Sequence, residues 1–273
     1  MAFPSFALVS RRALLRGTAA ACVASFAGCA ARVEVPAPGG TAQLRLIGET
    51  ILPHRMQFKD TTVGGLSAID YDPATGVWVT LSDDKSEFAP ARFYTLRVDV
   101  REGDLRVEVL DVVTLRQANG APFPKRSTRG QVVDPEAIRL LPAGRGVLWT
   151  SEGDERVEQD PGVRESRLDG SHVRDFEIPA HLHYAQRPGT GPHDNTTFEG
   201  LALTPDARIA WVSMEGALQQ DGPLPGVGRP GGPCRFTAFD VASGRAVRQI
   251  AYLPDAVQHA PAIPGGFADN GES

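Results

Sequence analysis

The fold is decided by residues 198–216, which read FEGLALTPDARIAWVSMEG. Two short apolar runs, Phe198–Leu203 and Ile209–Met214, flank a polar segment that contains Pro205 and Asp206. Aliphatic and aromatic runs on either side of Pro and Asp turn residues are typical of a β-hairpin. The stretch therefore predicts two antiparallel strands joined by a tight turn.

Two earlier stretches have the same layout: residues 65–84 read GLSAIDYDPATGVWVTLSDD, and residues 135–153 read PEAIRLLPAGRGVLWTSEG. In each of the three, a hydroxyl or acidic residue precedes a second acid by 16 positions; the pairs are Ser67 and Asp83, Glu136 and Glu152, and Glu199 and Glu215. The midpoint of every pair falls in the predicted turn. We therefore expect the members of a pair to lie opposite or nearly opposite each other, with Cβ atoms about 4.5–5.5 Å apart.

A second predicted hairpin follows each of these three, in residues 92–110, 163–178 and 235–253. An inner hairpin followed by an outer one makes four antiparallel strands, which is the composition of a β-propeller blade. The sequence thus predicts an all-β fold, a β-propeller-like array of four-stranded antiparallel blades with about three blades plus fragments. A smaller sandwich or an irregular open array is the alternative.

The remaining segments fit an incomplete ring. Residues 42–50 are predicted to form an outer strand that completes a last blade, and residues 269–273 resemble the opening of another blade. Because propellers typically close with about 4–8 blades, three blades plus fragments do not complete a ring. We therefore expect residues 41–273 to be one propeller domain that is incomplete, as in a truncated product.

Composition and charge agree with an all-β protein and exclude one class of partner. The chain has 29 Gly and 22 Pro, and no long helical period follows residue 40. The net charge of −5 offers no general electrostatic attraction for nucleic acid. Cys234 is the only cysteine after residue 40, so no disulfide within this domain is expected.

Residues 1–40 are interpreted as an export signal with a short linker. The basic Arg11-Arg12 pair precedes the apolar run 18–28, which resembles a twin-arginine signal and is too short for a confident membrane span. The sequence around Cys29 resembles a lipobox, so lipidation at Cys29 would give a membrane-anchored lipoprotein. Cleavage after Ala31 would instead give a free periplasmic protein. The expected contacts are with the export machinery and, through a lipid anchor only, with the membrane.

Five motifs, taken in order, carry a resemblance to a known family. They are Gly65–Ile69, Asp134–Ile138, Leu148–Gly153, Asn195–Leu203 and Asn270–Ser273. Together they resemble the phytase-like family described as having "esterase-like activity of phytase". The resemblance runs from about residue 45 to the end of the chain and implies a propeller with phosphoester-hydrolase or related esterase activity. It also implies that the repeated Glu and Asp residues form the active site, and members of the family tend to continue beyond the last motif.

The repeated acids point to divalent-metal chemistry. If the ends of the inner strands converge near the axis, five carboxylates form a ring: Asp83, Glu136, Glu152, Glu199 and Glu215. Hard oxygen ligands suit Ca²⁺ or Mg²⁺, and Ca²⁺ is favoured where six to eight ligands are arranged flexibly. Carboxylates held this close repel one another, and such a cation would relieve that repulsion. It would also bind a small phosphorylated substrate or ester, with Glu136 and Glu199 as the catalytic residues. Lys85, Arg129 and Arg156 are candidates for binding phosphate oxygens.

Other interpretations of the same residues remain open. Each Glu can serve a structural role by accepting backbone hydrogen bonds or by pairing with an Arg. The protein would then be a non-catalytic propeller that binds a ligand and contains structural calcium. His181, His183 and His193 form a second candidate metal site, in which His181 and His183 would face one side of a strand. No Gly-x-Ser-x-Gly motif supports a serine-hydrolase mechanism.

Overall fold

The computed structural model describes residues 8–9, 44–125, 131–184 and 188–263, and their regular structure is almost entirely β. The first sheet has the order β4-β5-β6-β7, with strands Leu66–Asp72, Val77–Ser82, Arg92–Arg101 and Asp104–Thr114. The second has the order β8-β9-β10-β11, with strands Pro135–Leu141, Gly146–Ser151, Gly162–Ser166 and His172–Asp175. Three short 3₁₀ helices occupy connections: Pro142–Gly144, Glu155–Val157 and Ala180–Leu182.

The third sheet has five strands in the order β1-β15-β14-β13-β12, and its antiparallel strands are Phe198–Leu203 (β12), Ile209–Ala217 (β13), Cys234–Asp240 (β14) and Arg245–Tyr252 (β15). The two-residue strand β1 (Leu8–Val9) is parallel to β15, while β2 (Gln57–Phe58) and β3 (Thr61–Thr62) form a separate ribbon. All six predicted hairpins are confirmed, each inner hairpin continuing into an outer one.

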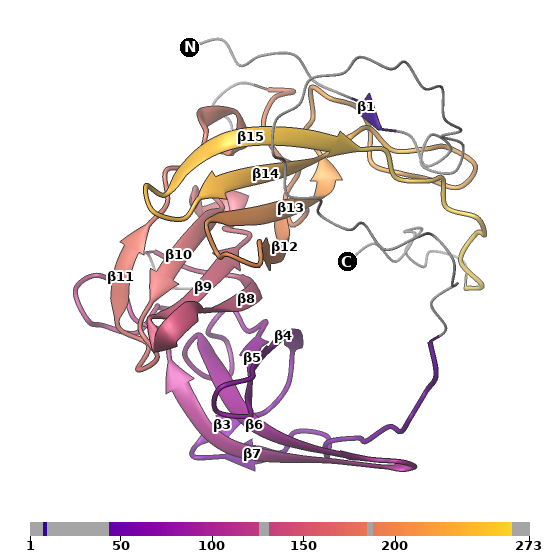
Figure 1. Cartoon of the computed structure of the whole chain (residues 1–273). Coiled ribbons are helices and arrows are strands. Elements are labelled where there is room, and N and C mark those ends of the chain that lie inside the picture. The colour runs from indigo at the N-terminus through magenta and orange to yellow at the C-terminus, as the bar shows by residue number, and fades with distance from the viewer. Residues whose placement is uncertain (1–7, 10–43, 126–130, 185–187, 264–273) are drawn as a thin grey trace, which may run out of the picture.

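The three sheets follow one another around an arc, with β4, β8 and β12 innermost and β8 in contact with both β4 and β12 (Figure 1). This arrangement is compatible with propeller blades. The part of the chain that the structure describes forms an open arc and no closed ring.

The core lies between consecutive sheets and follows the two-residue period of a strand. On β9, Val147 and Trp149 pack toward the first sheet with Phe93 and Leu81, whereas Leu148 packs toward the third sheet with Phe198. Every residue of β9 is buried. The second sheet is therefore held on both faces, which fixes how the three inner strands meet.

The predicted facing of the paired acids is wrong by about two residues. The structure has a β-bulge at the first member of each pair, in the intervals Leu66/Ala68, Pro135/Ile138 and Phe198/Gly200. The amide of each second member donates instead to the carbonyl two residues before the first member: Asp83 to Gly65, Glu152 to Asp134 and Glu215 to Thr197. A bulge inserts an extra residue into one strand and re-aims its side chain. The repeated pairs thus correspond to three equivalent bulges. Each bulge places the first member of the pair outside the regular ladder of hydrogen bonds.

Residues 44–50 correct a second prediction, because they form no strand. They run beside the β6–β7 turn, where the Gly103 amide donates to the Ile47 carbonyl over 3.0 Å and Arg45 pairs with Glu102 at 2.9 Å. The twin-arginine motif, Cys29, Arg129 and the last motif at residues 270–273 lie outside the described residues. Within the described residues, no helix has the length and apolar character needed to span a bilayer.

Candidate functional site

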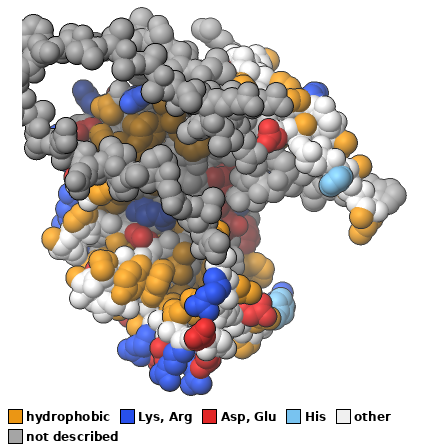
Figure 2. All heavy atoms as spheres, turned by 45° about the vertical axis from the view of Figure 1, so that its right-hand side comes forward, with side chains coloured by type: hydrophobic (Ala, Val, Ile, Leu, Met, Phe, Trp, Pro, Cys, Tyr) orange, Lys and Arg blue, Asp and Glu red, His pale blue; other side chains and the backbone are white. Residues whose placement is uncertain are grey.

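A polar cavity of about 480 Å³ lies where the three inner strands meet. Its lining comes from all three sheets and the loops before them: Ser67, Asp83, Lys85, Asp134, Glu136, Asn195, Glu199 and Glu215. Figure 2 shows Asp and Glu side chains together in a recess near the middle of the molecule. Four of the five predicted acids line this cavity, and the fifth, Glu152, approaches two of them as described next.

Two overlapping groups of carboxylates have the spacing of metal ligands. Oxygen atoms of Asp83, Asp134 and Glu136 lie within 4.8 Å of one another, and so do oxygen atoms of Glu136, Glu152 and Glu199. Glu136 belongs to both groups, because the bulge at the start of β8 turns it into the space between its neighbours. The predicted convergence of acids from successive hairpins is therefore confirmed as geometry.

Burial of these carboxyl groups makes their ionised forms unfavourable. Desolvation, together with the nearby Asp83 and Glu199, raises the pKa of Glu136 to about 10. Burial and the neighbouring Glu152 and Glu215 raise the pKa of Glu199 to about 8. Burial raises the pKa of Glu152 to about 7, against the effect of a hydrogen bond from the Thr197 amide. The protein thus holds acids that repel one another in a poorly solvated space.

The same desolvation raises the pKa of Asp134 to about 7, although Lys85 opposes the rise. At the rim, burial also raises the pKa of Asp83, again against the charge of Lys85. Lys85 forms an ion pair with Asp134 and donates to the Asn195 side chain over 2.8 Å. Among the described residues that line the cavity, Lys85 is the single cation. One ammonium group faces five or more carboxyls, so much of the potential negative charge is uncompensated.

The polar atoms around the cavity are held by a second layer of hydrogen bonds. Glu152 Oε1 accepts from the Thr197 amide over 2.6 Å, and the Thr197 hydroxyl donates to the Glu152 carbonyl over 2.9 Å. Ser67 donates to the Glu136 carbonyl over 2.8 Å, which ties the first sheet to the second. These contacts hold the backbone under Glu136 and Glu152 in place, and one of them also occupies a carboxylate oxygen of Glu152.

One carboxylate oxygen in the cavity lining has no hydrogen-bond partner among the described residues. Asp134 is 2% exposed, and its Oδ1 atom has no hydrogen bond from any described residue. An unsatisfied buried oxygen is costly unless a further group binds it. A divalent cation bound by hard oxygen ligands fits this donor set, and carboxylate oxygens alone suit Ca²⁺ and Mg²⁺ better than softer metals.

The predicted basic residues differ in position. Lys85 lines the cavity, whereas Arg156 is exposed and pairs with Asp194 at 3.2 Å. Arg156 is not among the residues that line the cavity. Two lining residues were missed as ligands, Asp134 and Asn195. Asp134 stands two residues before Glu136, and its carbonyl accepts a backbone hydrogen bond that recurs at the same position in the other two hairpins. Its place beside the repeated acid was the signal available in the sequence.

The histidines do not form the candidate second metal site within the described residues. The segment Ala180–Leu182 is a 3₁₀ helix, so the strand that would have aligned His181 and His183 is absent there. His181 contacts Gln249 at 3.2 Å, and His183 contacts Asp160 at 3.2 Å. Among the described residues, no group with metal-ligand spacing contains a histidine.

Solved structures with a similar chain path are distant. A periplasmic gluconolactonase from Pseudomonas aeruginosa is 15% identical, with a TM-score of 0.38 over 74% of this chain and 60% of that one. A putative 6-phosphogluconolactonase from Bacteroides uniformis is 13% identical, with a TM-score of 0.31 over 70% of this chain and 58% of that one. The matched part thus spans about three fifths of either structure. The search of curated proteins found no match.

A family model gives a direct assignment. The model described as phytase-like, "esterase-like activity of phytase", matches residues 61–271, which include all three sheets and every acid of the cavity. The chain therefore belongs to the phytase-like family, as its motifs predicted.

Proposed function

We propose that this protein is a propeller-type hydrolase of phosphoesters that depends on a divalent cation held by the carboxylates of the central cavity. The observation that carries the proposal is the position of Glu136, which is shared by two groups of three carboxylates within 4.8 Å. The buried, unpartnered Asp134 Oδ1 beside it supports the same site independently. Family membership favours ester hydrolysis as the reaction class.

Calcium is the cation that the donor set favours. The cavity offers carboxylates from Asp83, Asp134, Glu136 and Glu199, and the Asn195 side chain adds a neutral oxygen. Several loops and three sheets contribute these groups, and Ca²⁺ tolerates such an irregular set better than Mg²⁺ does. When bound, the cation would offset the carboxylate repulsion, polarise a phosphoryl oxygen and lower the pKa of a bound water.

The residues of the chain supply proton transfer and orientation. Hydrolysis forms a bond from a water oxygen to phosphorus and breaks the bond from phosphorus to the alcohol oxygen, which leaves with a proton. Glu136 and Glu199 lie within reach of a common ligand, so one carboxyl can take the proton of the water while the other gives a proton to the leaving alcohol. Lys85 stands at the cavity wall, where its ammonium group can orient a phosphoryl oxygen.

The test is turnover of 4-nitrophenyl phosphate and of bis(4-nitrophenyl) phosphate by purified protein after EDTA treatment, with Ca²⁺ or Mg²⁺ then restored. We expect turnover that requires the cation and is lost in Glu136→Gln and in Glu199→Gln. Glu177→Gln, an exposed acid paired with Arg245 at 3.0 Å, is the matched control and should retain activity. Equal turnover with and without EDTA would remove the metal from the proposal.

A non-catalytic role is favoured by one observation. Lys85, the single cation among the described lining residues, is already engaged by Asp134 and Asn195, which leaves little positive charge for a phosphate. The protein would then be a binding module with structural calcium. Melting that depends on Ca²⁺, together with no turnover of either substrate under any metal, would support this second candidate.

We also propose that the protein is exported to the periplasm or anchored to the membrane as a lipoprotein. The Arg11-Arg12 pair and the lipobox-like sequence at Cys29 support this placement. Replacing both arginines by lysine should hold the protein in the cytoplasm on cell fractionation. Cys29→Ala should move it from the membrane fraction to the soluble periplasm if lipidation provides the anchor.

A further inference from the structure

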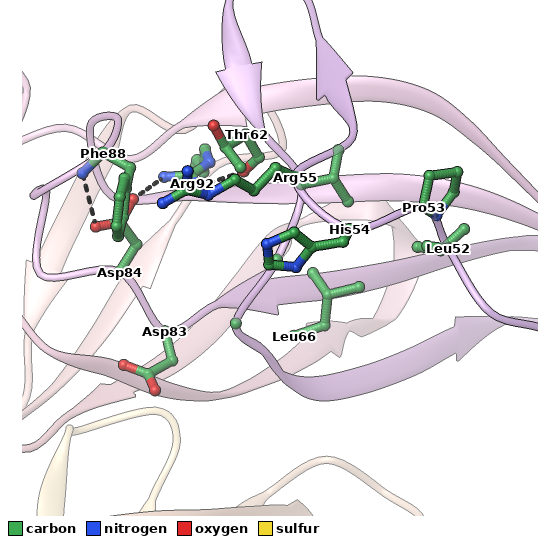
Figure 3. Close-up of a pocket in the computed structure, with 13 residues that line it drawn as sticks. Leu52, Pro53, His54, Arg55, Thr62, Leu66, Asp83, Asp84, Phe88 and Arg92 are labelled. Atoms are coloured by element: carbon green, nitrogen blue, oxygen red, sulfur yellow. Dashed lines mark hydrogen bonds and ion pairs between the residues drawn. The ribbon is translucent and has the colours of Figure 1, made fainter.

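A second cavity, of about 580 Å³, adjoins the carboxylate cavity. Asp83 lines both cavities, so a ligand in one extends directly toward the other. Figure 3 shows the side chains that surround the second cavity. Its walls come from the segment before β2, from residues 62–66 between β3 and β4, and from the loop that joins β5 to β6 together with Arg92 at the start of β6. Asp83 is the one described lining residue that belongs to a metal-ligand cluster.

This second cavity differs in character from the first, because its walls are largely apolar. Five of its lining side chains are hydrophobic: Leu52, Pro53, Val63, Leu66 and Phe88. Phe88 is 73% exposed and Leu66 is 39% exposed, which is unusual for side chains of this size next to a cavity. Exposed apolar surface beside a polar reaction site is typical of a binding pocket for an organic group.

The loop that carries Phe88 is fixed in place. The buried carboxylate of Asp84 accepts hydrogen bonds from the amides of Glu87, Phe88 and Ala89 over 2.8, 3.2 and 3.1 Å. The same carboxylate forms an ion pair with the buried Arg92 at 2.7 Å. This bracing fixes the backbone that carries Phe88 at the edge of the cavity. A preformed loop backbone reduces the entropy cost of binding.

The Leu66 wall is fixed by a glycine. Gly65 has a φ of +56°, and a Cβ at this position would lie 2.7 Å from the Asp83 carbonyl oxygen. Only glycine permits this close approach without strain. The approach holds Leu66 and Asp83 at adjacent strand ends, and so joins the apolar wall to the carboxylate cavity.

The guanidinium group of Arg55 and the imidazole of His54 also line this cavity. Within the described residues, neither side chain has a hydrogen bond or ion pair. Arg92 lines it too, but its guanidinium group is saturated by Asp84, Tyr94 and the Thr62 carbonyl. Arg55 therefore remains available to an anionic group of a ligand.

We infer that this cavity is a subsite for an aromatic group on an anionic ester, with the ring against Phe88 and Leu66 and the anionic portion between Arg55 and the carboxylate cavity. The inference rests on the proposed function for the reaction, but the binding of the ring stands on the walls alone. It predicts a preference for aryl phosphoesters over a phosphorylated polyol, which has no apolar group to bury.

The first test measures binding without turnover. The probe is 8-anilinonaphthalene-1-sulfonate, whose rings and sulfonate match the two features of the cavity, and its fluorescence is titrated with wild-type protein in EDTA. We expect Phe88→Ala to weaken binding by about tenfold, since loss of an aromatic contact has that order of effect. Arg55→Gln should weaken it and reduce its dependence on salt. Val247→Ala, which removes an exposed apolar side chain on β15, is the control and should have no effect. Unchanged binding in Phe88→Ala would overturn the inference.

The second test separates the subsite from the reaction. In the presence of Ca²⁺, kcat/KM is compared for 1-naphthyl phosphate and glycerol phosphate. We expect a preference for the naphthyl ester that falls several-fold in Phe88→Ala and is retained in the control Val247→Ala. If the probe binds as expected and neither ester is hydrolysed, the proposed reaction fails and the subsite stands. If both proteins hydrolyse the esters and the preference for the naphthyl ester is the same in wild type and Phe88→Ala, the subsite fails and the reaction stands.

Discussion

Glu136→Gln should make the metal-free protein more stable near neutral pH, which is the opposite of what removal of a buried polar contact usually does. The pKa of Glu136 in the folded protein is about 10, against 4.5 for the free side chain. Because the folded state holds the proton more tightly, the favourable contribution is complete below the lower value. It is lost progressively as pH rises toward the higher one.

The magnitude follows from the width of that interval. Each pH unit between the two values costs at most about 1.4 kcal/mol of unfolding free energy for one group. Between about pH 5 and about pH 7 the upper limit is therefore about 3 kcal/mol, and entry of water into the open cavity should reduce it to about 1–2 kcal/mol. Glutamine resembles the protonated acid in shape and does not titrate, so the variant should lack this loss.

The assay is urea unfolding in EDTA at about pH 5 and about pH 7, monitored by tryptophan fluorescence. It compares wild type, Glu136→Gln and the exposed control Glu177→Gln. We expect the variant and the wild type to be nearly equal at the lower pH and to separate by about 1–2 kcal/mol at the higher one. Parallel pH dependence in wild type and Glu136→Gln would refute the reasoning, since it would mean that Glu136 is solvated in the folded state.

Three further predictions concern the cation and the frame around it. Ca²⁺ at about 100 times its dissociation constant at about pH 8 should stabilise wild type by about 3 kcal/mol, as thermal melting will show. The same Ca²⁺ concentration should stabilise it less at about pH 5, because the carboxyls must lose protons to bind the cation. Trp149→Ala should lower the free energy of unfolding in urea by about 3–5 kcal/mol, because the ring is fully buried between two sheets and its Nε1 donates to Ser166 over 3.0 Å. A loss below about 1 kcal/mol would contradict that packing. Gly65→Ala should cost about 1–3 kcal/mol, whereas Gly76→Ala, with open space at its Cβ, isolates the cost of positive φ alone.

Much of the fold could be predicted because its information is local. Alternating apolar residues and turn residues identify each hairpin, and a hairpin needs only neighbouring stretches of chain to form. The twelve strands β4 to β15 were predicted in this way, to within a few residues at their ends. Residues 44–50 failed because their apolar residues resemble a strand, although the backbone bond from Gly103 to Ile47 commits them to the β6–β7 turn.

The acids illustrate a partial success. Their repetition was visible in the sequence, and the structure confirms that acids from all three sheets converge. Their facing was predicted about two residues out of register, and the β-bulge that accounts for one of these two residues leaves no composition signal of its own. Arg156 could not be distinguished from Lys85 in advance, because the choice depends on which loop partner, Asp194 or Asp134, lies nearby.

The sequence by itself determined the three hairpin pairs, the family and the set of acids that repeat along the chain. Each of these depends on residue type and spacing within a few tens of residues. Only the tertiary structure decided that Glu136 is shared between two groups of carboxylates, that Asp134 joins them with a buried oxygen left unpaired, and that an apolar cavity begins at Asp83. These features depend on distances between different sheets, which are set by how the sheets pack and not by any one strand.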